Sequence, residues 1–226
     1  DTMPWSAIPA PEPQSTCYVW SLSRPIHNLL SELVLLQHTH SLKRLEVLLT
    51  GQQITGWAPF AGRGIASKAV AVVCEFLKET YDINLSHSTA VFAEKNPDKR
   101  GFLSAQHPSV PCMVDNISRL VSSSVRNEKS GEAQHTLGHC FYLDGGVPCV
   151  SRTPLSSRCA TLIDCVQTKS GETGTNYELF RQVVQLHAPE IVTCECVEGL
   201  AARSAPDSES DAEYIVSTMH RLGHWA

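Results

Sequence analysis

The chain has 226 residues, enough for one domain with a sizeable hydrophobic core. Hydrophobic residues make up 42% of it and charged residues 18%, with 13 Gly and 13 Pro, which excludes collagen-like, coiled-coil and wholly disordered chains. The net charge of −5 lacks the basic excess of a protein that binds nucleic acid over a broad surface, so we expect any nucleic-acid contact to be local.

The nine cysteines are an odd number, and several lie inside apolar runs, which favours free thiols in a reducing compartment over a disulfide scaffold. The longest apolar stretch, residues 69–74, is far shorter than the ~20 residues that cross a bilayer, and the first 25 residues lack a signal-peptide core. We therefore expect no contact with a membrane and an intracellular location, nuclear if the source is a eukaryote. The sequence indicates no particular oligomeric state.

In chain order, the five prolines among residues 1–25 predict a poorly ordered arm, and the remaining residues, 26–226, are predicted to form one catalytic domain. From Ile26 to Gly51 the apolar residues recur at helical spacing, which predicts one helix or two. Because the chain begins at Asp1 without an initiator Met, we expect a processed chain or a fragment.

Short apolar runs then alternate with helical patterns. Strands are predicted near residues 54–60, 89–94, 110–114, 140–147 and 189–194, and helices near 65–81, 98–106, 176–187 and 208–222. The polar segments 118–137 and 151–175 are predicted to be loops, the second long enough to cover an active site. This alternation predicts an α/β fold with a doubly wound, mostly parallel, Rossmann-like sheet and helices on both faces. Ligands of such sheets bind at the carboxyl ends of the strands.

The last predicted helix opens on an acidic stretch, residues 207–213. Ser208 and Asp211 have the spacing of a capping box, in which each side chain accepts a hydrogen bond from the backbone of the other. We interpret the acidic stretch as a solvated helix start.

Residues at the ends of the first three predicted strands suit a cofactor that contains a nucleoside. The first group is the turn Phe60-Ala61-Gly62-Arg63-Gly64-Ile65, whose glycines let the backbone approach a ligand at a helix N-terminus. Glu94, with Lys95 beside it, ends the second strand, where a carboxylate accepts hydrogen bonds from both ribose hydroxyls. Asp115 and Asn116 end the third, where a carboxylate accepts from the adenine amino group. Each group also has a plainer interpretation as a turn, a surface acid or a helix cap, but their order favours the cofactor.

Two further groups follow the fourth and fifth strands. Pro148-Cys149 places a thiol on a loop that proline stiffens, so Cys149 is a candidate nucleophile or else a small core residue. Glu195 interrupts an apolar run, and a partly buried carboxyl there would be a weak enough acid to donate a proton near neutral pH. Cys194 and Cys196 suggest metal ligands, but without a C-x-x-C pair we predict no metal site.

In this order the blocks resemble the conserved motifs of the cytosine-5 DNA methyltransferases. Phe60-Ala61-Gly62-Arg63-Gly64 resembles that family's S-adenosylmethionine loop, Glu94 its ribose acid and Asp115 its adenine contact. Gly146-Val147-Pro148-Cys149 resembles its nucleophile loop, and Glu195-Cys196-Val197 its Glu-Asn-Val block. The resemblance covers roughly residues 54–226.

The resemblance implies S-adenosylmethionine as cofactor and a cytosine, flipped out of a DNA duplex, as substrate. It implies that Cys149 adds to carbon 6 of the base and that Glu195 protonates ring nitrogen 3. Arg152 and Arg158 follow the nucleophile on its loop, where they either meet phosphate or the base or are surface arginines. Two alternatives stay open: methylation of cytosine in transfer RNA, and a non-catalytic module that retains only the fold. The sequence departs from the family at Cys196, where the family has Asn, in residues 151–157, and at its end, which precedes a target-recognition region.

Overall fold

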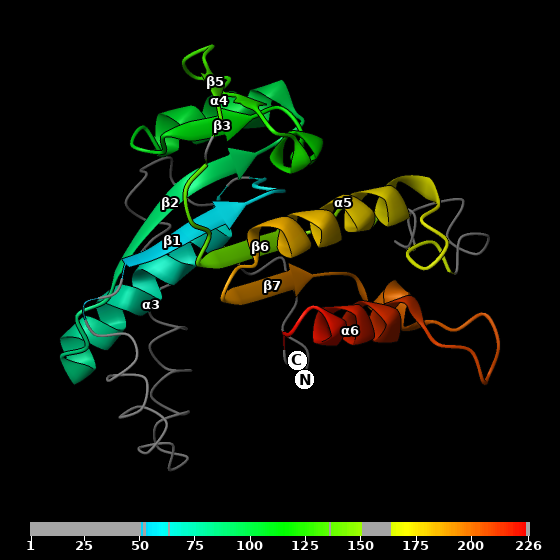
Figure 1. Cartoon of the computed structure of the whole chain (residues 1–226). Helices are drawn as coiled ribbons and strands as arrows, with labels where there is room; N and C mark the ends of the chain where they lie inside the picture. The colour runs from blue at the N-terminus through cyan, green and yellow to red at the C-terminus, as the bar shows by residue number, and fades with distance from the viewer. Residues whose placement is uncertain (1–50, 52, 63, 136, 151–163, 225–226) are drawn as a thin grey trace, which may run out of the picture. The chain divides into compact units, whose positions relative to one another are not determined.

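The computed structural model describes residue 51 and residues 53–62, 64–135, 137–150 and 164–224 (Figure 1). The predicted arm at 1–25, the helical segment 26–50 and Arg152 lie outside the described residues. Contacts divide the chain into two units, Asp1–Gln52 with Lys68–Ser86 and Gln53–Ser67 with His87–Ala226, and each is described by itself. Among the described helices, none is long and apolar enough to span a membrane.

Helix α3 (Ile65–Tyr81) contributes its residues from Lys68 onward to the first unit. Its apolar residues at helical spacing, among them Val72 and Phe76, are buried. Asp82 takes a left-handed conformation, with φ of 56°, directly after the helix ends. The predicted bounds of this helix are confirmed, because the apolar spacing begins and ends with it.

The second unit is built on a five-stranded sheet in the order β3-β2-β1-β6-β7 (Figure 1). The strands are β1 (Gln53–Ala58), β2 (Ser86–Ala93), β3 (Cys112–Val114), β6 (Tyr142–Gly146) and β7 (Ile191–Glu195). The pairs β2–β3, β1–β6 and β6–β7 are parallel. From β1 the chain first builds outward to β2 and β3, and then returns to the other side of β1 with β6 and β7. The order therefore reverses between β1 and β6, and in doubly wound sheets this is where ligands bind.

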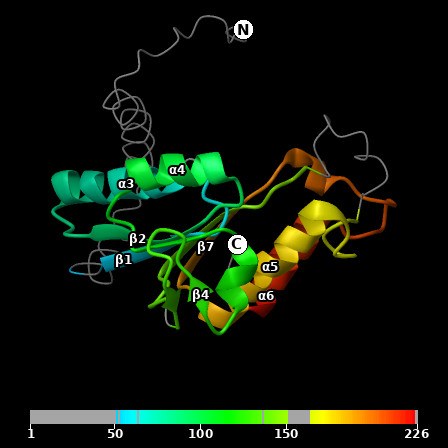
Figure 2. The same cartoon turned by 90° about the horizontal axis from the view of Figure 1, so that it is seen from above.

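Side chains that alternate along the strands divide into two cores, one on each face of the sheet. Trp57, Val91, Val114 and Leu143 join a large cluster with buried residues of α5 (Gly171–His187) and α6 (Asp211–Arg221). Their strand neighbours Ala58, Phe92 and Met113 form a smaller cluster with Leu103 of α4 (Pro97–Gln106). Figure 2 shows α4 on one side of the strands and α5 and α6 on the other. The predicted doubly wound α/β fold with helices on both faces is confirmed.

The segment 118–137 differs from the loop predicted there. It contains most of the 3-10 helix η2 (Ile117–Val121) and a short antiparallel pair, β4 (Val125–Arg126) with β5 (Ala133–Gln134). Buried Asn127 fixes this pair beside β3, because its side-chain oxygen accepts from the Met113 N–H at 3.1 Å and its amide donates to the Pro111 carbonyl at 2.7 Å. The polar composition of the segment predicted a loop. The prediction missed these elements because a single asparagine, bonded to backbone groups, holds them, and such contacts leave no hydrophobic pattern in the sequence.

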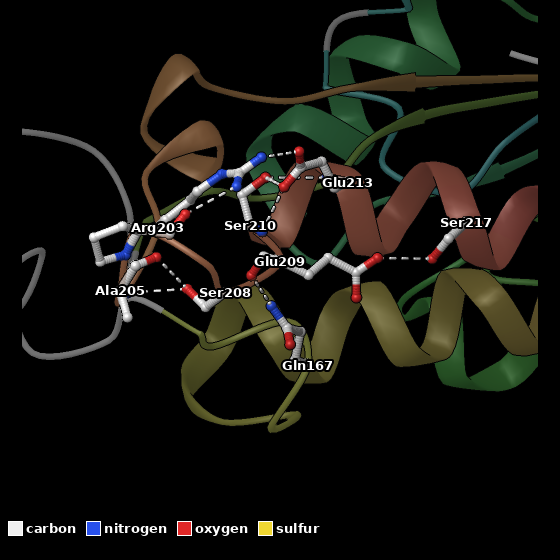
Figure 3. A network of polar contacts seen from close by, with 9 residues as sticks. Gln167, Arg203, Ala205, Ser208, Glu209, Ser210, Glu213 and Ser217 are labelled. Atoms are coloured by element: carbon white, nitrogen blue, oxygen red, sulfur yellow. Dashed lines mark hydrogen bonds and ion pairs between the residues drawn. The ribbon is translucent and has the colours of Figure 1, made fainter.

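Two helix starts also differ from the predictions. Helix α5 begins at Gly171 rather than near Asn176, which shortens the predicted loop at 151–175. Helix α6 begins at Asp211, and its capping box pairs Ser210 with Glu213 rather than Ser208 with Asp211 (Figure 3). The Ser210 side chain accepts from the Glu213 N–H at 3.2 Å, and the Ser210 N–H donates to Glu213 at 2.8 Å. Arg203 also contacts the Glu213 carboxylate.

Asp211, expected in a solvated acidic stretch, is fully buried. Its carboxylate accepts hydrogen bonds from the backbone N–H groups of Val166 and Gln167, each at 3.2 Å. Gln167 in turn donates to the Glu209 carbonyl at 2.8 Å, as Figure 3 shows. The first residue of α6 therefore anchors the turn that precedes α5, and the prediction of a solvated Asp211 is wrong.

Replacing Asp211 with alanine is expected to lower the free energy of unfolding by about 2–4 kcal/mol, because the buried Val166 N–H and the part-buried Gln167 N–H lose their acceptor. Urea unfolding in reducing buffer measures this. Asp211→Asn keeps one acceptor oxygen and should lose less. The matched control is Asp207→Ala, an exposed carboxylate of the same stretch, which should change stability by no more than about 0.5 kcal/mol. Equal effects of Asp211→Ala and Asp207→Ala would contradict the anchoring role.

Candidate functional site

The turn after β1 requires glycine at two positions. Gly62 and Gly64 have φ of 54° and 71°, a left-handed backbone that other residues rarely adopt. The Gly64 N–H donates to the Ala61 carbonyl at 2.7 Å, and a Cβ on Gly64 would lie 2.8 Å from the His107 ring nitrogen Nε2. The turn is therefore tight and leads directly into the first turn of α3, where Ile65 is 59% exposed.

Glu94 joins this turn to the end of β2. One carboxylate oxygen accepts from the Gly62 N–H at 2.9 Å, and the other accepts from the Asn96 N–H at 2.9 Å. The Arg100 guanidinium donates to the backbone carbonyls of Glu94 and Lys95, at 2.9 and 2.8 Å. Within the described residues these hydrogen bonds use one lone pair on each carboxylate oxygen of Glu94, and a second lone pair on each could accept from a ribose hydroxyl.

The residues after β3 have partners of their own. Asp115 accepts from the Arg119 guanidinium at 3.3 Å, and its side chain is 39% exposed. Asn116 is the N-cap of η2, with its side-chain oxygen accepting from the Ser118 N–H at 2.9 Å. The helix cap at this strand end is therefore Asn116, and Asp115 is the residue of the pair whose carboxylate is partly exposed.

Cys149 lies beyond β6 on the loop that begins with Val147 and Pro148. Its thiol donates to the Val147 carbonyl at 3.0 Å. Burial raises the pKa of the Cys149 thiol above its ordinary value, the Val197 N–H acts in the opposite direction, and the nearby Cys196 and Glu195 raise it further. The side chain is part-buried and packs against the large core.

The end of β7 brings Glu195 to the same region. Gly146 and Glu195 are partners across the parallel β6–β7 pair, and a Cβ on Gly146 would lie 3.6 Å from the Glu195 carboxylate. Glu195 is exposed, so its predicted partial burial is wrong. Its apolar neighbours Val192 and Cys194 pack on the large core, whereas β7 is an edge strand and leaves Glu195 in solvent on the opposite face.

Sequence reasoning missed three polar residues on that same face of β6 and β7. The Thr193 hydroxyl donates to the Asp144 carboxylate at 2.8 Å and lies 2.9 Å from the Tyr142 hydroxyl. Burial raises the pKa of the Tyr142 hydroxyl. Thr193 lies two residues before Glu195, and Asp144 is the partner of Thr193 on β6. Because every second residue of a strand faces the same side, the position of Glu195 could have pointed to Thr193 and its neighbours.

The second unit thus gathers two sets of groups at the carboxyl ends of its strands. The glycine turn and Glu94 lie at β1 and β2, and the loop of Cys149 and Glu195 lie at β6 and β7, on either side of the β1–β6 reversal. Among the described residues, no group of three or more His, Cys, Asp or Glu side chains is placed to hold a metal ion. A scan against protein-family models finds no match for the chain, and no curated protein matches it.

The raised pKa predicts how the Cys149 thiol reacts. Alkylation by iodoacetamide should be slow at pH 7.5 and should rise about tenfold per pH unit until the pH passes the thiol pKa, because only the thiolate reacts. Glu195→Gln removes a negative charge that disfavours the thiolate, so the pKa should fall and alkylation at pH 7.5 should become about two- to fivefold faster. Peptide mapping of Cys149 by mass spectrometry gives the rate.

The control for this measurement is Glu198→Gln, which removes an exposed carboxylate three residues further on. It should leave the alkylation rate of Cys149 within about twofold of the wild type, since surface charges further away are screened. An unchanged or slower rate in Glu195→Gln would contradict the coupling between the carboxylate and the thiol.

Proposed function

We propose that the second unit is the catalytic part of an S-adenosylmethionine-dependent methyltransferase that acts on carbon 5 of cytosine in DNA. The observation that supports this most is the arrangement of two groups far apart in the sequence. Glu195 pairs with Gly146, three residues before Cys149, at the ends of β7 and β6, and β6 neighbours the strand β1 whose glycine turn is tied to Glu94. This is the order and placement of groups that the resembled family would require.

The cofactor half of the proposal rests on the fit of the β1 and β2 ends. The positive-φ glycines leave backbone where a side chain would otherwise stand, Glu94 has free lone pairs for two ribose hydroxyls, and Asp115 has an exposed carboxylate for an amino group. The exposed side chain of Ile65 adds an apolar surface beside the turn. When bound there, S-adenosylmethionine supplies an electrophilic methyl group.

Carbon 5 of cytosine is a poor nucleophile and must be activated before it can take a methyl group. The Cys149 thiolate adds to carbon 6, which moves electron density onto carbon 5, and the Val197 N–H stabilises the sulfur charge before attack. Ring nitrogen 3 gains a proton as the adduct forms, and Glu195 is the acid proposed to deliver it. After methyl transfer, carbon 5 loses its proton and the bond between carbon 6 and Cys149 breaks, which regenerates the thiolate.

A base stacked in a duplex is out of reach of these groups, so the target cytosine leaves the stack. Part-buried Cys149 and exposed Glu195 suit a base delivered from solvent. Arg152, outside the described residues, follows Cys149 by three positions and is proposed to meet the phosphate or the base of the flipped nucleotide.

Product analysis tests the proposal. The chain is incubated with S-adenosylmethionine and either a cytosine-containing DNA duplex or a transfer RNA, and the digested nucleosides are examined by mass spectrometry. 5-Methyldeoxycytidine from the duplex is the expected result. 5-Methylcytidine from RNA alone would change the substrate, and no methylated cytosine from a chain that binds the cofactor would favour the non-catalytic module.

A further inference from the structure

Arg100 of α4 contacts the short loop that follows β2. Its guanidinium nitrogen Nη1 donates to the backbone carbonyl of Glu94 at 2.9 Å and to that of Lys95 at 2.8 Å. These two residues lie between the end of β2 and the start of α4, in a stretch of irregular backbone. One arginine side chain therefore holds two successive peptide groups of this loop.

The backbone of this loop decides where the Glu94 carboxylate lies. That carboxylate accepts from the Gly62 N–H and from the Asn96 N–H, each at 2.9 Å, and both bonds require a fixed position of the Glu94 Cα. The Arg100 N–H also donates to the Asn96 carbonyl at 3.0 Å, so the arginine is tied to the loop by its own backbone as well. Hydrogen bonds from a charged donor are stronger than neutral ones, which suits the guanidinium to this role.

Arg100 differs in this respect from the lysines on either side of it in the sequence. Lys95 and Lys99 are exposed, whereas Arg100 is part-buried and spends a guanidinium nitrogen on backbone carbonyls. A cation that served only to keep the surface charged would extend into solvent. The partners of Arg100 therefore indicate that it orients the loop.

We propose that Arg100 is a positioning residue for the ribose of the cofactor, because it holds the Glu94 loop where the carboxylate can accept from both ribose hydroxyls at once. This role rests on the proposed function, which requires a nucleoside at Glu94. Arg100 itself need not touch the cofactor. Its loss should therefore reduce the preference for a ligand that carries both hydroxyls and spare the binding of the rest of the ligand.

Isothermal titration calorimetry with two ligands tests this role. The ligands are S-adenosylhomocysteine and its analogue without the two ribose hydroxyls. The wild type should bind the first at least about 30-fold more tightly, because the analogue lacks two hydrogen bonds to a charged acceptor. In Arg100→Ala this ratio should fall to about threefold or less, while the affinity for the analogue stays within about threefold of the wild type. Arg100→Lys keeps a cation but loses the planar fork, so its ratio should be intermediate.

The ratio separates positioning from a general loss of structure, which would weaken both ligands alike. Lys99→Ala is the matched control, since it removes an exposed cation one position earlier in α4, and it should keep the wild-type ratio. In a Glu94→Ala chain, adding Arg100→Ala should not change the ratio further, because the two residues act through one carboxylate. A wild-type ratio in Arg100→Ala would overturn the proposal.

Hydrogen exchange of the Gly62 N–H, followed by NMR without ligand, tests the same role apart from any cofactor. Exchange should be at least about fivefold faster in Arg100→Ala and unchanged in Lys99→Ala, because Gly62 donates to the Glu94 carboxylate. Equal exchange in Arg100→Ala and the wild type would overturn the positioning role. A wild-type chain that binds neither ligand would contradict the proposed function, and the exchange rates would still decide whether Arg100 holds Glu94.

Discussion

Replacing Cys149 with serine is expected to abolish methyl transfer to cytosine, with a rate at least about 10³-fold lower, or about 4 kcal/mol of transition-state stabilisation. A serine hydroxyl is far less acidic than a thiol, so almost none of it is ionised near neutral pH. Scintillation counting of tritiated methyl groups in the DNA measures the rate. Cofactor binding should be unchanged, because Cys149 is not among the groups that hold Glu94 and the glycine turn.

Two further variants sharpen this prediction. Cys194→Ala, which removes a neighbouring thiol that packs on the core, should cost no more than about threefold once the variant is shown to be folded. Glu195→Gln should lower the transfer rate by about 10²–10⁴-fold, although it makes the Cys149 thiol more reactive toward iodoacetamide. If Cys149→Ser transferred methyl groups at the wild-type rate, Cys149 would be excluded as the nucleophile.

Replacing Glu94 with alanine is expected to weaken the binding of S-adenosylmethionine at least about 100-fold, which corresponds to about 2.7 kcal/mol. The substitution removes the acceptors for two ribose hydroxyls and also releases the Gly62 and Asn96 N–H groups that hold the turn. Glu94→Gln preserves the shape and one acceptor oxygen, so it should bind more weakly than wild type and more tightly than the alanine variant. Isothermal titration calorimetry gives all three dissociation constants.

The control for Glu94 is Asp98→Ala, an exposed carboxylate in the first turn of α4 that should leave cofactor affinity within about twofold. Circular dichroism shows whether each variant is folded before it is titrated. If Glu94→Ala and the wild type bound S-adenosylmethionine with equal affinity, the ribose of the cofactor would not contact Glu94. A folded wild-type chain that does not bind S-adenosylmethionine would contradict the cofactor assignment itself.

The sequence predicted the sheet well, because its strands carry a strong physical signal. Short apolar runs separated by helical patterns can be buried on both faces only in a parallel sheet with helices on either side. The five strands formed within a few residues of their predicted positions, and helix α3 has the predicted bounds. The glycine turn also followed from sequence, since Gly62 and Gly64 both take positive φ.

Other features depend on tertiary contacts that the local pattern does not contain. Polar residues before Asn176 predicted a loop, but Gly174 lies so close to the Cys165 carbonyl that a Cβ would clash, and this packing is part of an earlier start of α5. Asp211 was predicted to be solvated, but it accepts hydrogen bonds from the backbone of Val166 and Gln167, which are more than 40 residues away in the sequence. Local propensity is a weak guide where such contacts decide the structure.

The position of Glu195 shows the same limit within the site. Its apolar neighbours predicted burial, yet whether alternate residues of a strand face a core or solvent depends on what covers each face and on whether the strand is an edge. The sequence placed Cys149 and Glu195 at successive strand ends, but which residue of β6 lies opposite Glu195 depends on the register of β6 and β7. The spacing of apolar residues in the sequence does not predict the register between two strands.

The most direct test is covalent trapping on a DNA duplex with 5-fluorocytosine at the target position, in the presence of S-adenosylmethionine. Fluorine at carbon 5 cannot leave as a proton does, so the adduct should survive denaturation. We predict a complex that needs the cofactor and whose peptide map places the modified base on the sulfur of Cys149. A chain that binds the cofactor and the duplex but gives no adduct, or an adduct on another cysteine, would contradict the account.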